Sequence, residues 1–132
     1  MSCDESEKIQ VINIEQLQKK NFKKYYKIIQ ISCSITSIDT YFFNNYLSIE
    51  SIYLPDSLTQ IEDYAFFGCK NLKEIIIPKN VKKIGNYCFM GCINLNKVEL
   101  PNCLKEIGES AFSNCSALTE IKIPENVVKI NE

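Results

Sequence analysis

The chain has 132 residues, 45% of them apolar, which allows one folded domain and is not typical of a disordered protein. Its 15 basic residues nearly balance 16 acidic ones, so the net charge of −1 gives no overall attraction to nucleic acid. Every basic residue is a lysine and histidine is absent. The usual bidentate phosphate ligand, the commonest general base and the commonest metal ligand are therefore missing.

Residues 1–12 are polar and acidic, and we expect a frayed lead there. No stretch has the apolar core of a secretory signal, and no apolar run has the length of a membrane span. The default localisation is therefore cytoplasmic, with the cell surface as the alternative if the N-terminus is incomplete.

Residues 13–27 predict an amphipathic helix with Asn13 as its N-cap. Its apolar side would carry Ile14, Leu17, Phe22, Tyr25 and Tyr26, and its basic side Lys19, Lys20, Lys23, Lys24 and Lys27. The favoured interpretation is a cap that covers the open end of a stacked core and leaves the lysines in water. The alternative is a basic surface for an acidic partner, anionic lipid or nucleic-acid backbone.

From Pro55 onward the sequence repeats with a period of 23 residues, and a degraded copy over residues 32–54 precedes the regular copies. A fixed period indicates a solenoid, because a single coil cannot bury its apolar side alone. Each copy closes on two apolar residues separated by one position, which predicts a strand with one buried face. The recurring columns include Pro55, Pro78, Pro101 and Pro124; Phe66, Phe89 and Phe112; Cys69, Cys92 and Cys115; and Leu72, Leu95 and Leu118.

Two further features of the copies predict local structure. Gly68, Gly91 and Asn114 precede the cysteine column, and these residue types tolerate positive φ, so we expect a left-handed turn there. Residues 58–61 predict a second short strand on the outer wall of the coil.

The pattern P-x-x-[LV]-x-x-I-x-x-x-[AC]-F-x-[GN]-C-x-x-L-x-x-[IV]-x-[IL] resembles the BspA-type leucine-rich repeat over residues 29–130. The resemblance implies an α/β repeat solenoid, a right-handed and mostly β coil with a parallel sheet on one wall. To this we add the N-terminal capping helix. We divide the chain into residues 1–28, lead and capping helix, and residues 29–132, about four coils of which the last is incomplete. The family implies a binding scaffold, often at cell surfaces of anaerobic bacteria and parasitic protists, with no shared ligand and no catalytic residues.

The C-terminal half-repeat ends without a polar capping segment. The predicted strand at residues 120–123 would then be an open sheet edge over an uncovered core, and exposed edges pair with other chains. Either the chain is a fragment of a longer array, or it associates end to end through this uncapped coil.

The seven cysteines allow two interpretations. Cys69, Cys92 and Cys115 should stack in adjacent coils, as a metal or redox site or as a structural ladder of small apolar side chains. The sequence has no short C-x₂₋₄-C pair and no histidine, so the structural ladder is favoured and no metal or other cofactor is predicted. Cys88 is assigned to the core, and Cys33 and Cys103 are expected to be exposed and reactive.

No group of residues in the repeats combines a base, a nucleophile and a phosphate loop, so we expect no enzymatic activity. Carboxylates such as Glu62 and Asp63 belong to columns that offer no partner for acid–base chemistry. The sequon at Asn114 coincides with a repeat turn and is not expected to be used.

The position between the two buried residues of each closing strand should point outward from the sheet-bearing wall. These five candidate partner-binding residues are Gln30, Tyr53, Ile76, Glu99 and Lys122. Tyr53 and Ile76 would form an apolar centre with Glu99 and Lys122 at its rim, although Ile76 also fits as a good strand former without a ligand. The predicted function is a non-catalytic protein–protein interaction scaffold with a partner of unknown identity. The alternative is a cell-surface adhesion or host-contact protein, and nucleic acid is a less favoured ligand.

Overall fold

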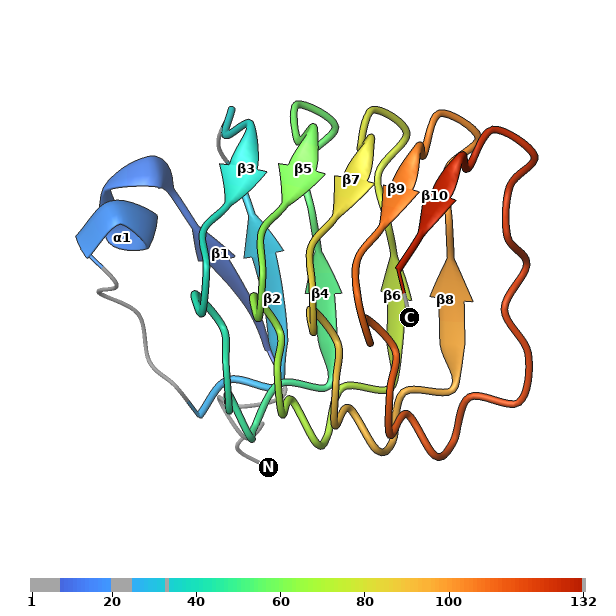
Figure 1. Cartoon of the computed structure of the whole chain (residues 1–132). Helices are drawn as coiled ribbons and strands as arrows, with labels where there is room; N and C mark the ends of the chain where they lie inside the picture. The colour runs from blue at the N-terminus through green and yellow to red at the C-terminus, as the bar shows by residue number, and fades with distance from the viewer. Residues whose placement is uncertain (1–7, 20–24, 33, 132) are drawn as a thin grey trace.

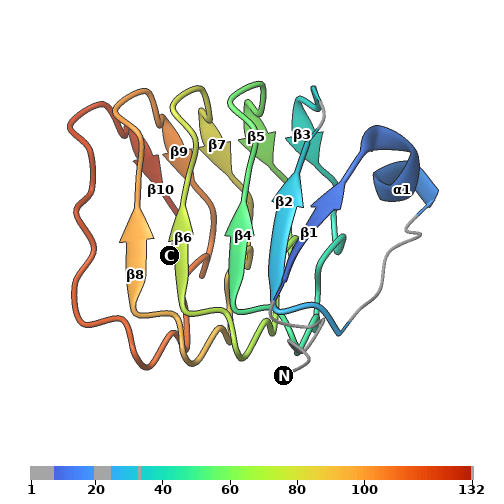
Figure 2. The same ribbon diagram turned by 180° about the vertical axis from the view of Figure 1, so that it is seen from behind.

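The computed structural model describes residues 8–19, 25–32 and 34–131. Successive coils stack in one row, with one parallel sheet on each of two opposite walls (Figures 1 and 2). The helix α1 (Ile14–Lys19) lies at one end of the row, and residues 118–128 form the other end. The predicted repeat solenoid with a parallel sheet is confirmed.

Each wall is a five-stranded parallel sheet whose neighbouring strands come from consecutive coils. Sheet A contains β1 (Ile9–Ile12), β2 (Ile28–Ile31), β4 (Ser51–Tyr53), β6 (Glu74–Ile76) and β8 (Lys97–Glu99). Sheet B contains β3 (Ser37–Ile38), β5 (Gln60–Ile61), β7 (Lys83–Ile84), β9 (Glu106–Ile107) and β10 (Lys129–Ile130). Sheet B is the second short strand of each repeat, so that prediction is confirmed. The register follows the repeat, because Ile75 faces Val98 and Ile61 faces Ile84.

The turn between the two sheets of each coil begins at the proline column. The carbonyl of Pro78 accepts the N–H of Val81 at 3.2 Å, and the same bond recurs from Leu104 to Pro101 at 3.1 Å. Proline has no N–H to extend the strand, so the sheet A strand ends there and the next apolar residue turns into the core.

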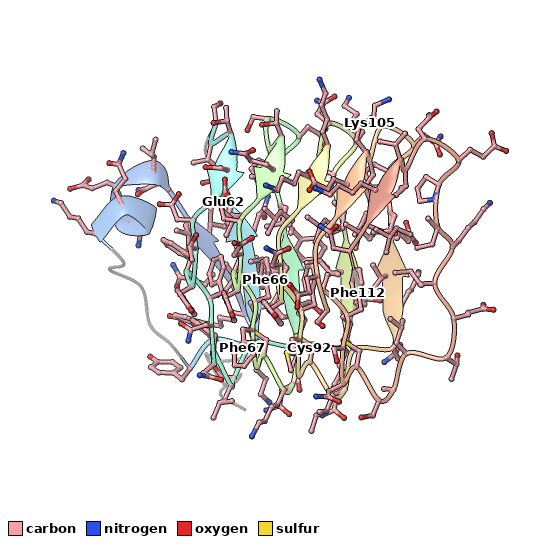
Figure 3. The ribbon with its side chains drawn as sticks, viewed as in Figure 1. Glu62, Phe66, Phe67, Cys92, Lys105 and Phe112 are labelled. Atoms are coloured by element: carbon pink, nitrogen blue, oxygen red, sulfur yellow. The ribbon has the colours of Figure 1, made fainter. Side chains whose placement is uncertain are left out.

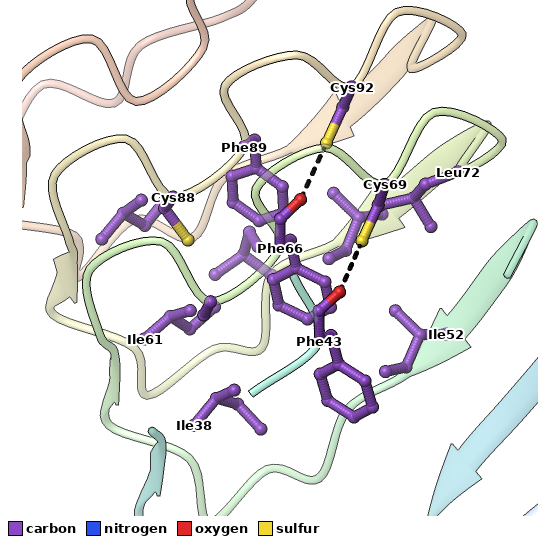
Figure 4. Close-up of a cluster of buried hydrophobic side chains, with 14 of the residues drawn as sticks. Ile38, Phe43, Ile52, Ile61, Phe66, Cys69, Leu72, Cys88, Phe89 and Cys92 are labelled. Atoms are coloured by element: carbon purple, nitrogen blue, oxygen red, sulfur yellow. Dashed lines mark hydrogen bonds between the residues drawn. The ribbon is translucent and has the colours of Figure 1, made fainter. Parts of the chain in front are cut away.

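The core is a set of columns in which each side chain packs on its equivalent in the next coil. The rings of Phe66 and Phe89 are parallel with centroids 5.1 Å apart, and those of Phe89 and Phe112 are 5.3 Å apart. Phe66 and Phe89 are fully buried (Figure 4). Phe66 and Phe112 lie between the two sheets, while charged side chains such as Lys105 lie at the margin (Figure 3). The distance between the ring centroids is about the distance between hydrogen-bonded strands. The rings can therefore stack at the spacing that the backbone pairing sets.

Left-handed backbone occurs at the predicted turn and at a second place. Gly68, Gly91 and Asn114 have φ of 71°, 79° and 60°, as expected. A second column also has positive φ, which the sequence did not predict because tyrosine and serine do not favour this backbone. Its members are Tyr41, Tyr64, Tyr87 and Ser110. Each coil therefore makes two left-handed corners, although a bulky residue rarely adopts this backbone.

Gly85 is required by the close approach of two coils. A Cβ at this position would lie 2.5 Å from the backbone nitrogen of Asp63 in the preceding coil. Gly108 meets the backbone of Asn86 in the same way. The glycine column thus sets how tightly the bends after sheet B can stack.

The N-terminal region differs from the prediction. Residues 9–12 are not a frayed lead but strand β1, which pairs with β2 from Ile9–Ile28 to Ile12–Ile31 and buries Ile12 completely. Asn13 is the N-cap, since its Oδ1 accepts the Gln16 N–H at 2.9 Å, but the helix ends at Lys19.

The predicted helix to residue 27 is therefore wrong over its last turn, and a capping role for α1 is not established. The carbonyl of Lys27 accepts the N–H of Glu50 at 2.7 Å, which commits this residue to the ladder leading into β2. Lys20, Phe22, Lys23 and Lys24 lie outside the described residues. The boundary between residues 28 and 29 stays a prediction.

The predicted strand at residues 120–123 is absent, and β8 is the last strand of sheet A. If the strand had continued the register, Glu120 would lie beside Lys97. The Lys97 side chain forms its ion pair within β8, where its Nζ lies 3.2 Å from Glu99. Sheet B continues one coil further, because Val128 and Asn131 donate to Lys105 and Ile107 at 2.9 and 3.1 Å. The last coil is therefore hydrogen-bonded on one wall only.

Replacing Gly85 with alanine should lower the free energy of unfolding by about 1–3 kcal/mol, because the new methyl group must displace the backbone at Asp63. Urea unfolding followed by circular dichroism measures the loss. The exposed substitution Lys82→Ala is the control and should change stability by less than about 0.5 kcal/mol. Equal midpoints for the two variants would show that the coils do not need the glycine.

Candidate functional site

The outward column of sheet A contains four of the five predicted binding residues on adjacent strands. Gln30 faces Tyr53, and Ile76 faces Glu99. Tyr53 and Ile76 are 52% and 54% exposed although their strand neighbours Ile52 and Ile75 are buried. Lys122 is exposed but lies on the unpaired segment after β8, so sheet A does not fix its position.

A groove of about 180 Å³ lies between β4 and β6, at the centre of this column. Tyr53 and Ile76 line it, with Ser51 and Glu74 beside one part of it and Asp56 beside another. Its residues come from two neighbouring strands held in parallel register, because Ser51 faces Glu74. The sequence identified the two apolar residues, but the groove between them depends on how β4 and β6 lie side by side.

Charged side chains around the groove form exposed ion pairs. Lys73 Nζ lies 3.3 Å from Glu50, and Lys97 Nζ lies 3.2 Å from Glu99. Such exposed pairs contribute little to stability, about 0–1 kcal/mol each. The Lys73–Glu50 pair lies where β4 and β6 begin, and the Lys97–Glu99 pair lies on β8.

Strand β1 adds apolar residues that the sequence analysis missed. Ile9 and Val11 are 52% and 49% exposed, and Val11 faces Gln30 in the same outward column as Tyr53. The alternation in residues 9–12 was the available signal. It was masked because β1 and β2 are offset by 19 residues rather than 23. The outer face of sheet A is thus largely apolar from β1 to β6 and charged from β8 onward.

The cysteine column is a structural ladder, as predicted. The Sγ of Cys92 donates to the carbonyl of Phe66 at 3.2 Å, and that of Cys69 donates to Phe43 at 3.0 Å (Figure 4). Cys115 makes the same bond to Phe89 at 3.2 Å. These three cysteines are free thiols, and the described residues contain no cluster suited to a metal ion.

Burial also disfavours the reactive thiolate form of Cys88, Cys92 and Cys115, because it helps to raise the pKa of each. Hydrogen bonding to Cys69, together with burial, raises the pKa of Cys92, and burial raises the pKa of Cys88 well above its ordinary value. Burial raises the pKa of Cys115 from 9.0 to about 12. Because the folded pKa is the higher one, Cys115 stabilises the fold below pH 9.0 and loses this contribution as the pH rises toward 12.

Cys103 does not behave as the sequence suggested. It is half-buried, and its Sγ contacts the carbonyls of Lys79 at 2.7 Å and Val81 at 3.1 Å. The thiol in the turn after Pro101 therefore contacts the preceding coil, and the predicted exposure of Cys103 is only partial. Cys3 and Cys33 lie outside the described residues.

A second groove, of about 360 Å³, lies between α1 and β3 at the N-terminal end. Its lining includes Ile14, Ile35 and Phe42, with Asp39 as its one charged residue. Its lining is mixed, because neutral polar groups are added by Gln18, Ser34, Thr36 and Ser37.

Comparison with known proteins identifies the repeat. The family model of the BspA-type leucine-rich repeat region matches residues 1–53 and 36–132, with six copies. The chain belongs to the BspA-type leucine-rich repeat family. Proteins of this family and fold are typically non-catalytic.

Solved structures support the same fold for this BspA-type chain. It is 26% identical to a leucine-rich repeat protein of T. pallidum, with a TM-score of 0.70, covering 92% of this chain and 62% of that one. Against the pneumococcal vaccine antigen PcpA the identity is 27% and the TM-score 0.67, over 78% of this chain and 26% of that one. A leucine-rich repeat protein of Bacteroides ovatus is 31% identical with a TM-score of 0.55, over 77% and 32%. This chain spans less than two thirds of each of these proteins.

No curated protein matches the chain at a significant level. In the part of the chain that the structure describes, the helical segment is too short and too polar to cross a bilayer.

Alkylation should separate the cysteines by burial. In the folded chain at pH 8, iodoacetamide should leave Cys69, Cys88, Cys92 and Cys115 unmodified, since these side chains are buried and the reagent cannot reach their sulfur atoms. Cys103 should react faster than these four but more slowly than in denaturant. Peptide mass spectrometry measures each site. Modification of Cys92 at the denatured rate would contradict the ladder.

Proposed function

We propose that this BspA-type chain is a non-catalytic protein-interaction module that binds a protein partner through the outer face of sheet A. The observation that carries the proposal is the pair Tyr53 and Ile76, both about half exposed on adjacent strands with a groove between them. Large apolar and aromatic side chains at the centre of a surface, with polar residues around them, are typical of protein interfaces. Gln30, Glu99 and Lys122 would form the surrounding contacts.

The alternative for Ile76 is a strand former without a ligand, but the burial of its neighbours favours a contact with a partner. Ile75 and Ile77 are 1% and 3% exposed and already supply the burial of β6. The equivalent position on β8 is Glu99, which keeps the strand with a charged residue. An exposed isoleucine is therefore not needed for the fold, and contact with a partner would give it a role.

The scaffold also favours binding through this wall. The strands are short, fixed in register and packed on buried columns, so the outward side chains are held in place before a partner arrives. Preorganisation lowers the entropy that association costs.

Adhesion at a cell surface is the second candidate. The family and its fold are those of repeat proteins for interaction or adhesion, and one solved relative is described as a pneumococcal vaccine antigen. The comparisons give no support to the cytoplasmic localisation expected from the sequence. An adhesion role is compatible with the same binding wall, since the two candidates differ in where the partner is met.

The central test is a capture experiment with matched variants. Replacing Ile76 with glutamate should weaken retention of the native partner at least about tenfold, since a charge would be buried in the interface. The control Thr59→Glu places the same charge on the outer side of the opposite wall and should retain full binding. A photoreactive residue at position 53 should cross-link the captured protein. Equal loss in both variants, or equal retention, would refute binding through sheet A.

End-to-end association through the C-terminal coil is a separate proposal. Val128 and Ile130 are 82% and 58% exposed, and residues 120–123 lie unpaired beside β8. Either a further coil of a longer array or a second solenoid would cover an exposed apolar end of this kind. Sedimentation of the reduced chain over a concentration series should show association, and the double variant Val128→Lys and Ile130→Lys should abolish it. A monomer at every concentration would exclude this contact.

A further inference from the structure

The groove on sheet A has a carboxylate at either end of its apolar middle. Ser51 and Glu74 face each other where β4 and β6 begin, and Asp56 follows where β4 has ended. Tyr53 and Ile76 lie between these ends. The groove therefore runs along the strands, with acid, apolar and acid groups in succession.

These carboxylates are available to a cation from outside. Glu74 has no ion pair within the described residues, because Lys97, its neighbour in register on β8, lies 3.2 Å from Glu99 instead. Asp56 has Lys79 at 3.8 Å, near the limit of an ion pair, with both side chains more than 70% exposed. A contact of that kind is easily exchanged for another. No lysine lines the groove itself.

The shape of the groove favours an extended chain. Neighbouring strands lie about 4.8 Å apart, so Tyr53 and Ile76 are adjacent side chains and the groove along them is narrow compared with a helix, which is about 10–12 Å across with its side chains. An extended segment presents residues i−2, i and i+2 on one face, spanning about 13 Å. An apolar side chain at i can then pack over Tyr53 and Ile76, while longer side chains at i−2 and i+2 reach toward Glu74 and Asp56.

We propose that this groove binds an extended peptide segment of the partner in which one apolar residue is flanked, two positions to either side, by basic residues. The apolar side chain packs over Tyr53 and Ile76, and the basic groups pair with Glu74 and Asp56. This inference rests on the proposed function and names the chemistry of the partner at the same site.

Other occupants fit this surface less well. A second copy bound face to face through the same groove would bring two sets of Glu74 and Asp56 together, and like charges at an interface oppose association. A nucleic acid would be repelled by the same carboxylates. Both remain outcomes that the experiment can detect.

The test uses the full chain and a capped seven-residue peptide, Ser-Lys-Thr-Leu-Thr-Lys-Ser. Two matched peptides replace both lysines with glutamate or the leucine with glycine. Binding is followed by NMR through the backbone amides of Tyr53 and Ile76. The basic peptide should bind at least about fivefold more tightly than either matched peptide and should weaken as salt rises.

Two protein variants locate the charge effect. Glu74→Gln should weaken the basic peptide about two- to fivefold and reduce its salt dependence. Glu125→Gln, which removes an exposed carboxylate from a distant turn, should change neither. Equal binding of the basic and acidic peptides, an unchanged affinity in Glu74→Gln, or no shift at Tyr53 and Ile76 would each overturn the inference.

The two proposals fail in different ways. If Ile76→Glu abolishes capture of the native partner but the basic peptide does not bind, sheet A remains the interface and only the chemistry of the segment is wrong. If Ile76→Glu leaves capture intact, the proposed function itself is wrong. Concentration-dependent line broadening without peptide, centred on Tyr53, would instead identify a second copy as the occupant and overturn the peptide inference.

Discussion

The backbone hydrogen bond between equivalent residues of consecutive coils is the interaction on which the rest of the molecule depends. Lys73 donates to Glu50 at 3.0 Å and Asn96 donates to Lys73 at 2.9 Å, so one position is linked through three coils. Because the bond fixes the spacing, each core residue meets its own equivalent. Phenylalanine then packs on phenylalanine at about the strand distance, and glycine is needed where two bends meet. Each interface between neighbouring coils therefore repeats the same hydrogen bonds and the same side-chain packing.

The same constraint separates fold from function within each repeat. Inward side chains must pack on the equivalent side chain of the next coil, whereas outward side chains in sheet A contact only solvent or a partner. Residue type is therefore free to change along the outward column, from Tyr53 and Ile76 to Glu99. The outward column can vary from coil to coil without altering the fold. Strand β1 adds the exposed Ile9 and Val11 to the apolar part of this wall.

Residues that resemble a chemical site are used by the fold. The carbonyl of Phe66 accepts the N–H of Cys69 in its own coil and the thiol of Cys92 in the next. A thiol suits this place because it is small, mostly apolar and able to donate one weak hydrogen bond to the second lone pair. Serine would bring a more polar group into a fully buried column. The recurrence of cysteine thus follows from packing between coils and needs no metal or redox chemistry.

The sequence by itself determined the period, the closing strands, the second short strand, the left-handed turn at Gly68 and the outward column, because each depends on residue type at a fixed offset. Tertiary structure alone decided the rest. Strand β1 escaped notice because its coil is 19 residues long, and Lys27 is not helical but bonds to Glu50 of the next coil. Residues 120–123 leave sheet A, Cys103 turns toward Lys79, and the groove forms only where β4 and β6 meet. These features depend on contacts between coils, which no local pattern records.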